Sequence, residues 1–486
     1  MRPYFLPAVA LMLTACATVP THDSKLSSSL DATAQGRLEQ AIAQLEEKTQ
    51  GENKNDLLLH LEKGELLRVG SRYQDSLTAF EVADAQVKQW EEIARDDPAR
   101  LLGQQAGALL LGDGSRTYEG QDYEKVMLTT RMAMNRLGLG DLDTARVDIK
   151  RTHEREAVIA AFRARETAEA EKEAQDKGIT TDARELNGYP IETLNDPQVL
   201  ELKNGFQNAL SHYMAGYVYE ALNEPSLAAP GYRKAIELRP NLAVLEEGLR
   251  GLDQRTSFRR KKGVTDVLFV IEAGHAPARK SQKVTFPVPT PSGLIAVPLS
   301  YPVIQPDSDP IVVEQVELGQ LSARADLIAD FNVMARKALK DELPGMQLRT
   351  AVRAIGKGLL QDQANRQLGP LGGLMGNIMV AATNPDADDR LWRSLPGRVF
   401  VARSFVPPGE YEVRIPGLAD AGNKLNIDGR YMIVPVRVFR NKTYFGEPAR
   451  FGSAGVLAQA EPAAAPEKKA PQKSAPRARA VQKKTR

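Results

Sequence analysis

The chain has 486 residues, more than one compact hydrophobic core normally holds, so we expect two or three domains. Hydrophobic residues make up 42% and charged residues 26%, which is typical of a folded protein and argues against a disordered chain. A single cysteine excludes an intramolecular disulfide. The net charge of +2 is uneven, because residues 456–486 hold eight Lys or Arg and two Glu, giving +6 there and −4 elsewhere.

The first sixteen residues have the pattern of a secretory signal. Arg2 precedes an apolar run, Phe5–Leu13, which is too short to span a bilayer. The run closes on Leu13-Thr14-Ala15-Cys16, and Cys16 is the only cysteine of the chain. This pattern resembles a bacterial lipoprotein signal, which implies that residues 1–15 are removed and that Cys16 is lipidated. The alternative is an ordinary signal with a chance cysteine.

The resemblance implies a lipid-anchored protein that faces the periplasm. Stable anchoring needs more than one acyl chain, which lipoprotein processing supplies. Ala17 follows Cys16, where an aspartate would in enterobacteria imply retention at the inner membrane, so the outer membrane is favoured. Residues 16–35 are rich in Ser and Thr and predict a flexible tether between the anchor and the folded body.

Residues 36–262 are predicted to be helical and contain three copies of one spacing. In each copy a small residue is followed by a second small residue at +12 and by a large one at +16, a pattern that resembles the tetratricopeptide repeat. The copies are Gly64, Ser76 and Phe80; Ala133, Ala145 and Ile149; and Gly216, Ala228 and Tyr232. The alternative is a helical domain without repeats. Such stacks usually present a surface to a peptide or protein, and we name Tyr213, Tyr217 and Tyr219 as candidate partner-binding residues.

The rest of the helical half contains less regular segments. Residues 159–177 are rich in Ala, Glu and Arg and predict a long exposed helix, and residues 178–196 predict an irregular loop. Residues 255–262 form a short basic linker. The periodicity changes at Gly263, where we place the main domain boundary.

Residues 263–455 predict a mainly antiparallel sandwich of about six to eight strands. Val267–Ile271 is a continuous apolar run, typical of a fully buried strand. In residues 294–304, large apolar side chains alternate with small residues or prolines, as in a half-buried strand. Pro298 and Pro302 remove two backbone N–H groups from one side of this strand, so we expect it to lie at the edge of a sheet. Residues 399–405 and 411–415 predict a hairpin, and residues 434–438 predict a further strand.

A helical insertion is expected at residues 323–383. Its first helix has an apolar stripe that includes Leu327, Ile328, Phe331 and Met334. Pro344 is expected to end this helix before a second one begins. Residues 368–383 are uncharged and glycine-rich, and three interpretations stay open: burial against the sheet, docking of a partner, or contact with a membrane. The predicted fold is therefore α+β: a tetratricopeptide-like domain followed by a sandwich with an inserted helical hairpin.

Several stretches resemble a family of uncharacterised Gram-negative lipoproteins with a repeat-like helical N-terminal half. The matching stretches are Tyr118-Glu119-Gly120-Gln121-Asp122-Tyr123-Glu124-Lys125-Val126, Gly140-Asp141, Ala145-Arg146-Val147, Tyr219-Glu220 to Pro240, Asp266–Pro277 and Leu391-Trp392-Arg393-Ser394-Leu395-Pro396. The resemblance covers most of residues 40–450. It implies an architecture and brings no assigned activity.

The sequence offers no catalytic, cofactor or metal signature. The five histidines lack ligand spacing, and neither a Gly-x-Ser-x-Gly elbow nor a Ser-x-x-Lys pair occurs. His275 lies at the end of a predicted strand, and we assign it a structural role. The basic tail 456–486 is predicted to be disordered, and it either contacts an anionic envelope polymer or is a solvated extension. It has no interleaved aromatic residues, so we expect no nucleic acid partner.

These observations favour a non-enzymatic lipoprotein that scaffolds or regulates a cell-envelope assembly by binding a protein through its helical half. Two alternatives stay open. One is an enzyme acting on the cell wall or a polysaccharide, whose carboxylates meet only in the folded chain. The other is a structural component of a surface appendage or secretion apparatus.

Overall fold

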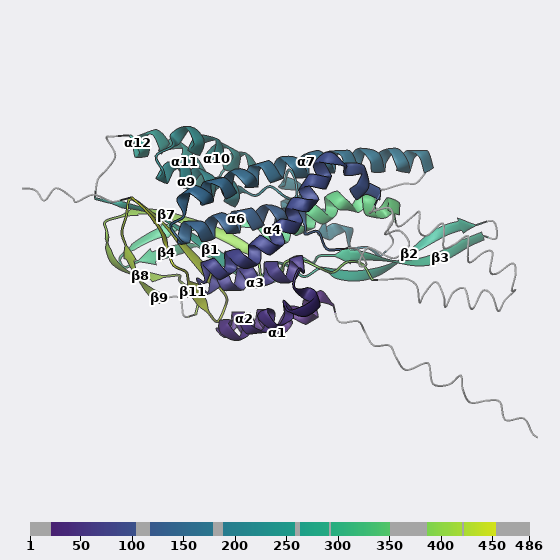
Figure 1. The fold of residues 1–486 in the computed structure, drawn as a ribbon, viewed down its shortest axis with the longest axis horizontal. Helices are drawn as coiled ribbons and strands as arrows, with labels where there is room; N and C mark the ends of the chain where they lie inside the picture. Colours follow the sequence, from purple (N-terminus) through teal and green to yellow (C-terminus); the bar gives the residue numbers. More distant parts are fainter. Residues whose placement is uncertain are drawn as a thin grey trace, which may run out of the picture.

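The computed structural model describes residues 21–103, 117–177, 188–257, 263–290, 293–349, 386–419 and 422–452. The fold is α+β: helices cover one face of a six-stranded sheet, and a four-stranded sheet lies on its other face (Figure 1). The predictions for the signal, for Cys16, for residues 368–383 and for the tail 456–486 lie outside the described residues.

The described N-terminal residues form a helix pair, α1 (His22–Ala34) and α2 (Leu38–Lys48). Thr21 caps α1 by accepting a hydrogen bond from the Ser24 N–H. Leu26 and Leu30 are one turn apart and pack in a common core with Ile42; Ser29 is buried beside them, whereas Ser27 and Ser28 are exposed. The prediction of a flexible tether is therefore wrong for residues 22–34, because one face of the helix is buried against its neighbours.

Three antiparallel helix pairs follow the predicted repeat spacing. They are α3 (Leu57–Val69) with α4 (Tyr73–Asp96), α6 (Asp122–Gly138) with α7 (Leu142–Lys177), and α9 (Ala209–Ala221) with α10 (Pro225–Leu238). A Cβ atom on Gly64 would lie 2.4 Å from the ring of Phe80, and one on Gly216 would lie 2.7 Å from that of Tyr232. The residue at +16 thus fills the space that the small residue leaves, as predicted.

Short helices complete the helical half: η1 (Gly51–Asn53), residues 98–103, η4 (Ile191–Thr193), α8 (Pro197–Glu201), α11 (Ala243–Arg250) and α12 (Leu252–Thr256). The long helix expected at residues 159–177 is the second half of α7. Residues 178–187 of the predicted loop and 258–262 of the predicted linker lie outside the described residues. Arg255 belongs to α12 and pairs with the buried Glu220, so it is not a solvated linker residue.

The central sheet has the strand order β11-β10-β1-β7-β6, with β12 also paired to β10. Its strands are β1 (Thr265–Ala273), β6 (Asp326–Asp330), β7 (Arg398–Val406), β10 (Tyr431–Val438), β11 (Thr443–Phe445) and β12 (Ala449–Phe451). Every residue of β1 is buried, as predicted for the apolar run. The pairing of β1 with β10 is parallel, so the sandwich is antiparallel only in its other pairs.

The second sheet has the order β5-β4-β8-β9 and consists of β4 (Gln315–Leu318), β5 (Leu321–Arg324), β8 (Gly409–Arg414) and β9 (Gly422–Ile427). Successive side chains of β1 point to opposite faces. Phe269 and Ile271 accordingly pack against the second sheet, while Leu268 and Val270 join the core shared with the helices.

Of the predicted hairpin and the predicted edge strand, the structure contains only the edge strand among its described residues. The predicted hairpin is wrong: β7 lies in the central sheet and β8 in the second, because Pro407 and Pro408 carry the chain from one sheet to the other. The predicted edge strand is confirmed, since among the described strands β3 (Gly293–Val303) pairs with β2 (Lys280–Thr290) alone, in a two-stranded ribbon that extends from the body (Figure 1).

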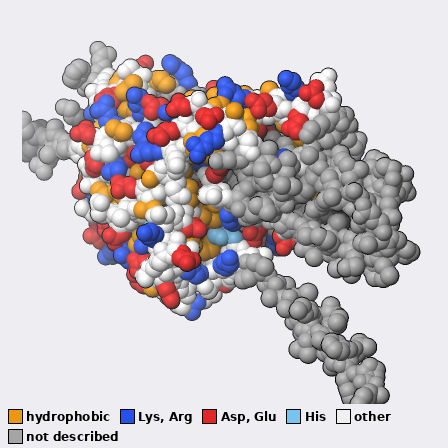
Figure 2. Space-filling view, turned by 45° about the vertical axis from the view of Figure 1, so that its right-hand side comes forward, with side chains coloured by type: hydrophobic (Ala, Val, Ile, Leu, Met, Phe, Trp, Pro, Cys, Tyr) orange, Lys and Arg blue, Asp and Glu red, His pale blue; other side chains and the backbone are white. Residues whose placement is uncertain are grey.

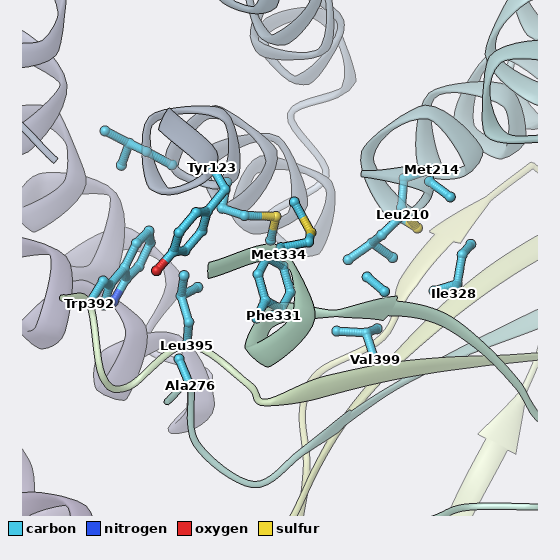
Figure 3. Close-up of a cluster of buried hydrophobic side chains, with 14 of the residues drawn as sticks. Tyr123, Leu210, Met214, Ala276, Ile328, Phe331, Met334, Trp392, Leu395 and Val399 are labelled. Atoms are coloured by element: carbon cyan, nitrogen blue, oxygen red, sulfur yellow. The ribbon is translucent and has the colours of Figure 1, made fainter. Parts of the chain in front are cut away.

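The first inserted helix spans residues 331–349 and contains the predicted apolar stripe from Phe331 to Leu339. The prediction is wrong for Leu327 and Ile328 and for the start of the insertion at residue 323, because these residues lie in the strands β5 and β6. Pro344 does not end the helix, because Leu343, Met346 and Leu348 are buried and hold the next turn in place. Residues 350–383, including the second predicted helix, lie outside the described residues. Phe331 and Met334 pack with Tyr123, Trp392 and Leu395 (Figure 3). One core therefore contains residues of both halves, and their division into separate domains stays a prediction.

Candidate partner-binding groove

An open groove of about 780 Å³ runs between α7 and the α9–α10 pair. We call it the α7–α10 groove; it is lined by Asp143, Arg146, Val147, Lys150, His153, Glu156, Gln207, His212, Tyr219, Leu227, Pro230, Gly231 and Lys234. Its shape depends on the close approach of α9 and α10, since a Cβ atom on Gly231 would lie 2.7 Å from the backbone nitrogen of Gly216. Glycine is therefore required at that crossing.

The groove exposes large apolar side chains. Val147 on α7 is 54% exposed and Leu227 on α10 is 47% exposed. Tyr219 and Pro230 line the same space. An exposed aliphatic residue is common by itself, but several in one concave surface are typical of a protein-binding site.

The rim of the groove carries three cations, each in an ion pair with a neighbouring acid. Arg146 lies 2.9 Å from Glu224, Lys150 lies 3.4 Å from Glu154, and Lys234 lies 3.1 Å from Glu237. Exposed pairs of this kind contribute about 0–1 kcal/mol each. A carboxylate of a partner protein can therefore replace the neighbouring acid in such a pair with little change in free energy.

Two histidines stack at the base of the groove. The rings of His153 and His212 have centroids 4.8 Å apart and are nearly parallel, and His212 Nε2 lies 3.0 Å from Glu156 Oε2. Burial, and to a lesser extent the charge of His212, lowers the pKa of His153, so His153 is neutral at physiological pH. Sequence reasoning missed this pair because α7 and α9, which bring the two rings together, are far apart along the chain.

Of the three tyrosines predicted to bind a partner, only Tyr219 lines the groove. Tyr213 and Tyr217 have no exposed surface. The hydroxyl of Tyr217 donates hydrogen bonds to the backbone carbonyls of Asp266 and Met432, and the ring of Tyr213 packs on Tyr232. The prediction is wrong for Tyr213 and Tyr217, because α9 is enclosed by its repeat partner and by the central sheet.

The other predicted residues are accounted for as follows. Cys16 lies outside the described residues. His275 is in contact with the backbone carbonyl of Leu30, 3.2 Å away, and burial lowers its pKa well below the usual range, which agrees with a structural role. Among the described residues, no cluster of three or more His, Cys, Asp or Glu is arranged to hold a metal ion.

Neither a protein-family model nor a curated protein matches this chain. Among solved structures, a tetratricopeptide repeat protein from Parabacteroides merdae is similar to part of it, at 15% identity. The similarity covers 47% of this chain and 98% of the other, with a TM-score of 0.14. A TM-score this low assigns no common fold, so the helix pairs described above rest on their own packing.

Charge gives no alternative binding face in the view of Figure 2, where basic and acidic side chains are interspersed over the described surface. Within the described residues, no helix combines the length and the apolar character that crossing a membrane requires.

Proposed function

We propose that the protein is a membrane-anchored periplasmic lipoprotein that scaffolds a cell-envelope assembly by binding a partner protein in the α7–α10 groove. The observation that carries the proposal is the exposure of Val147 and Leu227 on facing elements of one open groove. Apolar anchors in a concave surface with a polar rim are the usual centre of a protein interface.

The chemistry of the groove defines the partner segment. Apolar side chains of the partner would cover Val147, Leu227 and Tyr219. The rim presents its cations in pairs with carboxylates, so polar side chains of either charge can lie beside those apolar contacts. The expected ligand is therefore a segment of another envelope protein whose apolar side chains fill the groove and whose polar side chains lie at its rim.

The anchor is the second half of the proposal and rests on the resemblance of residues 1–16 to a lipoprotein signal. We expect Cys16→Ser to move the protein from the membrane pellet to the soluble fraction while its circular dichroism spectrum stays unchanged. Retention of the variant in the pellet would contradict attachment through Cys16.

Photo-crosslinking in living cells tests the groove. A benzoylphenylalanine at position 147 or 227 should give a defined adduct with another protein, and the same probe at Leu321 should not. Leu321 is a matched control, because it is also 47% exposed but lies on β5, which belongs to the second sheet. Adducts of equal yield from all three positions, or none from 147 and 227, would contradict the proposal.

A further inference from the structure

A second cavity, of about 240 Å³, lies where α4, α6, α7 and residues 331–349 meet. Its apolar lining includes Trp90, Phe162 and Met346. Cations and carboxylates line it as well, and the pairing of these charges indicates what the cavity can bind. It shares no lining residue with the α7–α10 groove.

Three of the four cations that line the cavity, Lys125, Arg163 and Arg349, already have partners. Lys125 Nζ lies 3.0 Å from Asp122 and 3.9 Å from the centre of the Trp90 ring. Arg163 lies 2.5 Å from both Asp122 and Glu166. Their charges are compensated within the protein, so neither residue requires a ligand.

Arg279 is different. The residue is only 5% exposed, and its Nε has no hydrogen-bond partner. Across the described ranges of the chain, no carboxylate lies within ion-pair distance of its guanidinium, although its charge acts on Glu342 and Asp388, which line the same cavity. An arginine stays charged in a protein, and a buried charge without a counterion costs several kcal/mol. Since the side chain lines the cavity, an anion bound there could pair with it directly, which neither Glu342 nor Asp388 does.

The carboxylates of the cavity restrict which anion fits. Glu171 and Glu342 line it together with Asp341 and Asp388. Glu342 lies 3.6 Å from Arg163, and burial raises its pKa, while Glu171 makes no ion pair in the part of the chain that the structure describes. So many carboxylates would repel a phosphate dianion or a dicarboxylate. They would attract a ligand that carries one carboxylate and one ammonium group.

We propose that the cavity binds a small zwitterion of the size of an amino acid or a dipeptide. Its carboxylate pairs with Arg279, its ammonium group faces Glu171 and Glu342, and its apolar part contacts Phe162 and Met346. Charge-assisted hydrogen bonds to a desolvated guanidinium are among the stronger contacts available to a small ligand.

Calorimetric titration of the full chain tests the proposal, with the standard amino acids and their L-alanyl dipeptides as zwitterionic probes. Succinate and 1,5-diaminopentane serve as probes with charge of one sign only. We expect at least one zwitterion to bind, and Arg279→Gln to weaken its binding about tenfold or more. The control variant Arg450→Gln, at an exposed arginine paired with Asp428, should leave the affinity unchanged. Binding of no zwitterion, or equally tight binding of succinate, would overturn the proposal.

A second measurement separates a ligand-binding role from a structural one. If Arg279 awaits a ligand, Arg279→Gln removes a buried charge that has no direct ion pair, and the ligand-free variant should melt at the same or a higher temperature than the wild type. If the arginine instead stabilises Glu342 and Asp388, the variant should melt at a lower temperature, which would overturn the proposal even if the variant still folds.

Discussion

The helices are joined to the central sheet through two buried ionic clusters that differ in their balance of charge. The arginine-rich cluster, under α3 and α6, contains Glu65 and Glu272 with Arg68, Arg131 and Arg437. The balanced cluster, under α9, contains Glu220 and Asp266 with Arg255 and Arg403. The difference in charge balance predicts which carboxylate, when removed, destabilises the fold most.

In the arginine-rich cluster, Glu272 on β1 accepts hydrogen bonds from both Arg68 and Arg131. Arg437 stands farther off, 3.7 Å from Glu65 and 3.9 Å from Glu272. Burial, reinforced by Arg131 and Arg68 and only partly offset by the two glutamates, lowers the pKa of Arg437 to about 10. The fold therefore holds one cation in excess at this point.

In the balanced cluster, each acid has a cation, and Glu220 has further donors. Arg403 lies 2.6 Å from Asp266 and 2.9 Å from Glu220. Glu220 also accepts a hydrogen bond from the hydroxyl of Tyr232, and Arg255 beside it is 15% exposed. Water can thus reach one cation of this cluster, whereas the arginines of the other cluster are almost completely enclosed.

The largest expected effect follows from removing the acid that two arginines share. Glu272→Gln leaves three buried arginines with one carboxylate, and we expect the free energy of unfolding to fall by about 4 kcal/mol. Urea denaturation followed by circular dichroism measures the change. Glu412→Gln, on the exposed part of β8, is the control and should change stability by less than about 0.5 kcal/mol.

The corresponding change in the balanced cluster should cost less. In Glu220→Gln, Arg403 keeps Asp266 and Arg255 can turn toward water, so we expect a loss of about 3 kcal/mol. The same urea titration applies. A larger loss for this variant than for Glu272→Gln would reverse the comparison.

Glu124 differs from the acids of both clusters, because it is a buried carboxylate whose hydrogen-bond donors are all neutral. Its partners are the hydroxyl of Tyr118 and the backbone N–H groups of Trp392 and Gln121. Burial outweighs these bonds and raises the pKa of Glu124 to about 7. The folded state then keeps a proton that the unfolded state loses, so Glu124 should reduce stability by about 2 kcal/mol between pH 5 and pH 7.

The matched variant Glu124→Gln should lack this loss, since it shares every other titratable group with the wild type. The midpoints of urea denaturation at pH 5 and pH 7 show how much stability each protein loses between these pH values. Parallel pH profiles for wild type and variant would show that Glu124 is ionised throughout.

The smallest loss of stability is expected on replacing Arg437, the cation in excess in the arginine-rich cluster. Arg437→Gln gives up two hydrogen bonds to the carbonyls of Gly274 and Ser394 but relieves repulsion from Arg68 and Arg131, so the net loss should be about 1 kcal/mol. Arg403→Gln, which leaves Asp266 without a cation, should cost at least twice as much. Equal losses for the two variants would mean that the charge balance of the clusters has no influence on stability.

The helix pairs and β1 could be predicted from the sequence because their signals are local. The +16 spacing links Gly64 to Phe80 within one helix pair, and the apolar run of β1 needs no knowledge of its neighbours. The parallel pairing of β1 with β10 and the separation of β7 from β8 depend on contacts across the whole domain, and no local pattern encodes them.

The site was less predictable for the same reason. The sequence of α9 contains one Asp, Glu, Lys or Arg residue, Glu220, and a helix that is apolar on all sides is usually buried. That signal would have removed Tyr213 and Tyr217 from the candidates. The surface of the α7–α10 groove and the environment of Arg279 arise where distant helices meet, so only the folded chain reveals them.

The position of β1 between β7 and β10 has a consequence for how the protein is made. A ribosome synthesises β1 more than a hundred residues before either neighbour, and contacts that span such distances form slowly. Until Tyr431–Val438 emerges, one flank of the strand has no neighbour, and Asp266 and Glu272 lack part of their surroundings. A nascent or prematurely terminated chain therefore exposes an aggregation-prone strand edge that the finished protein conceals.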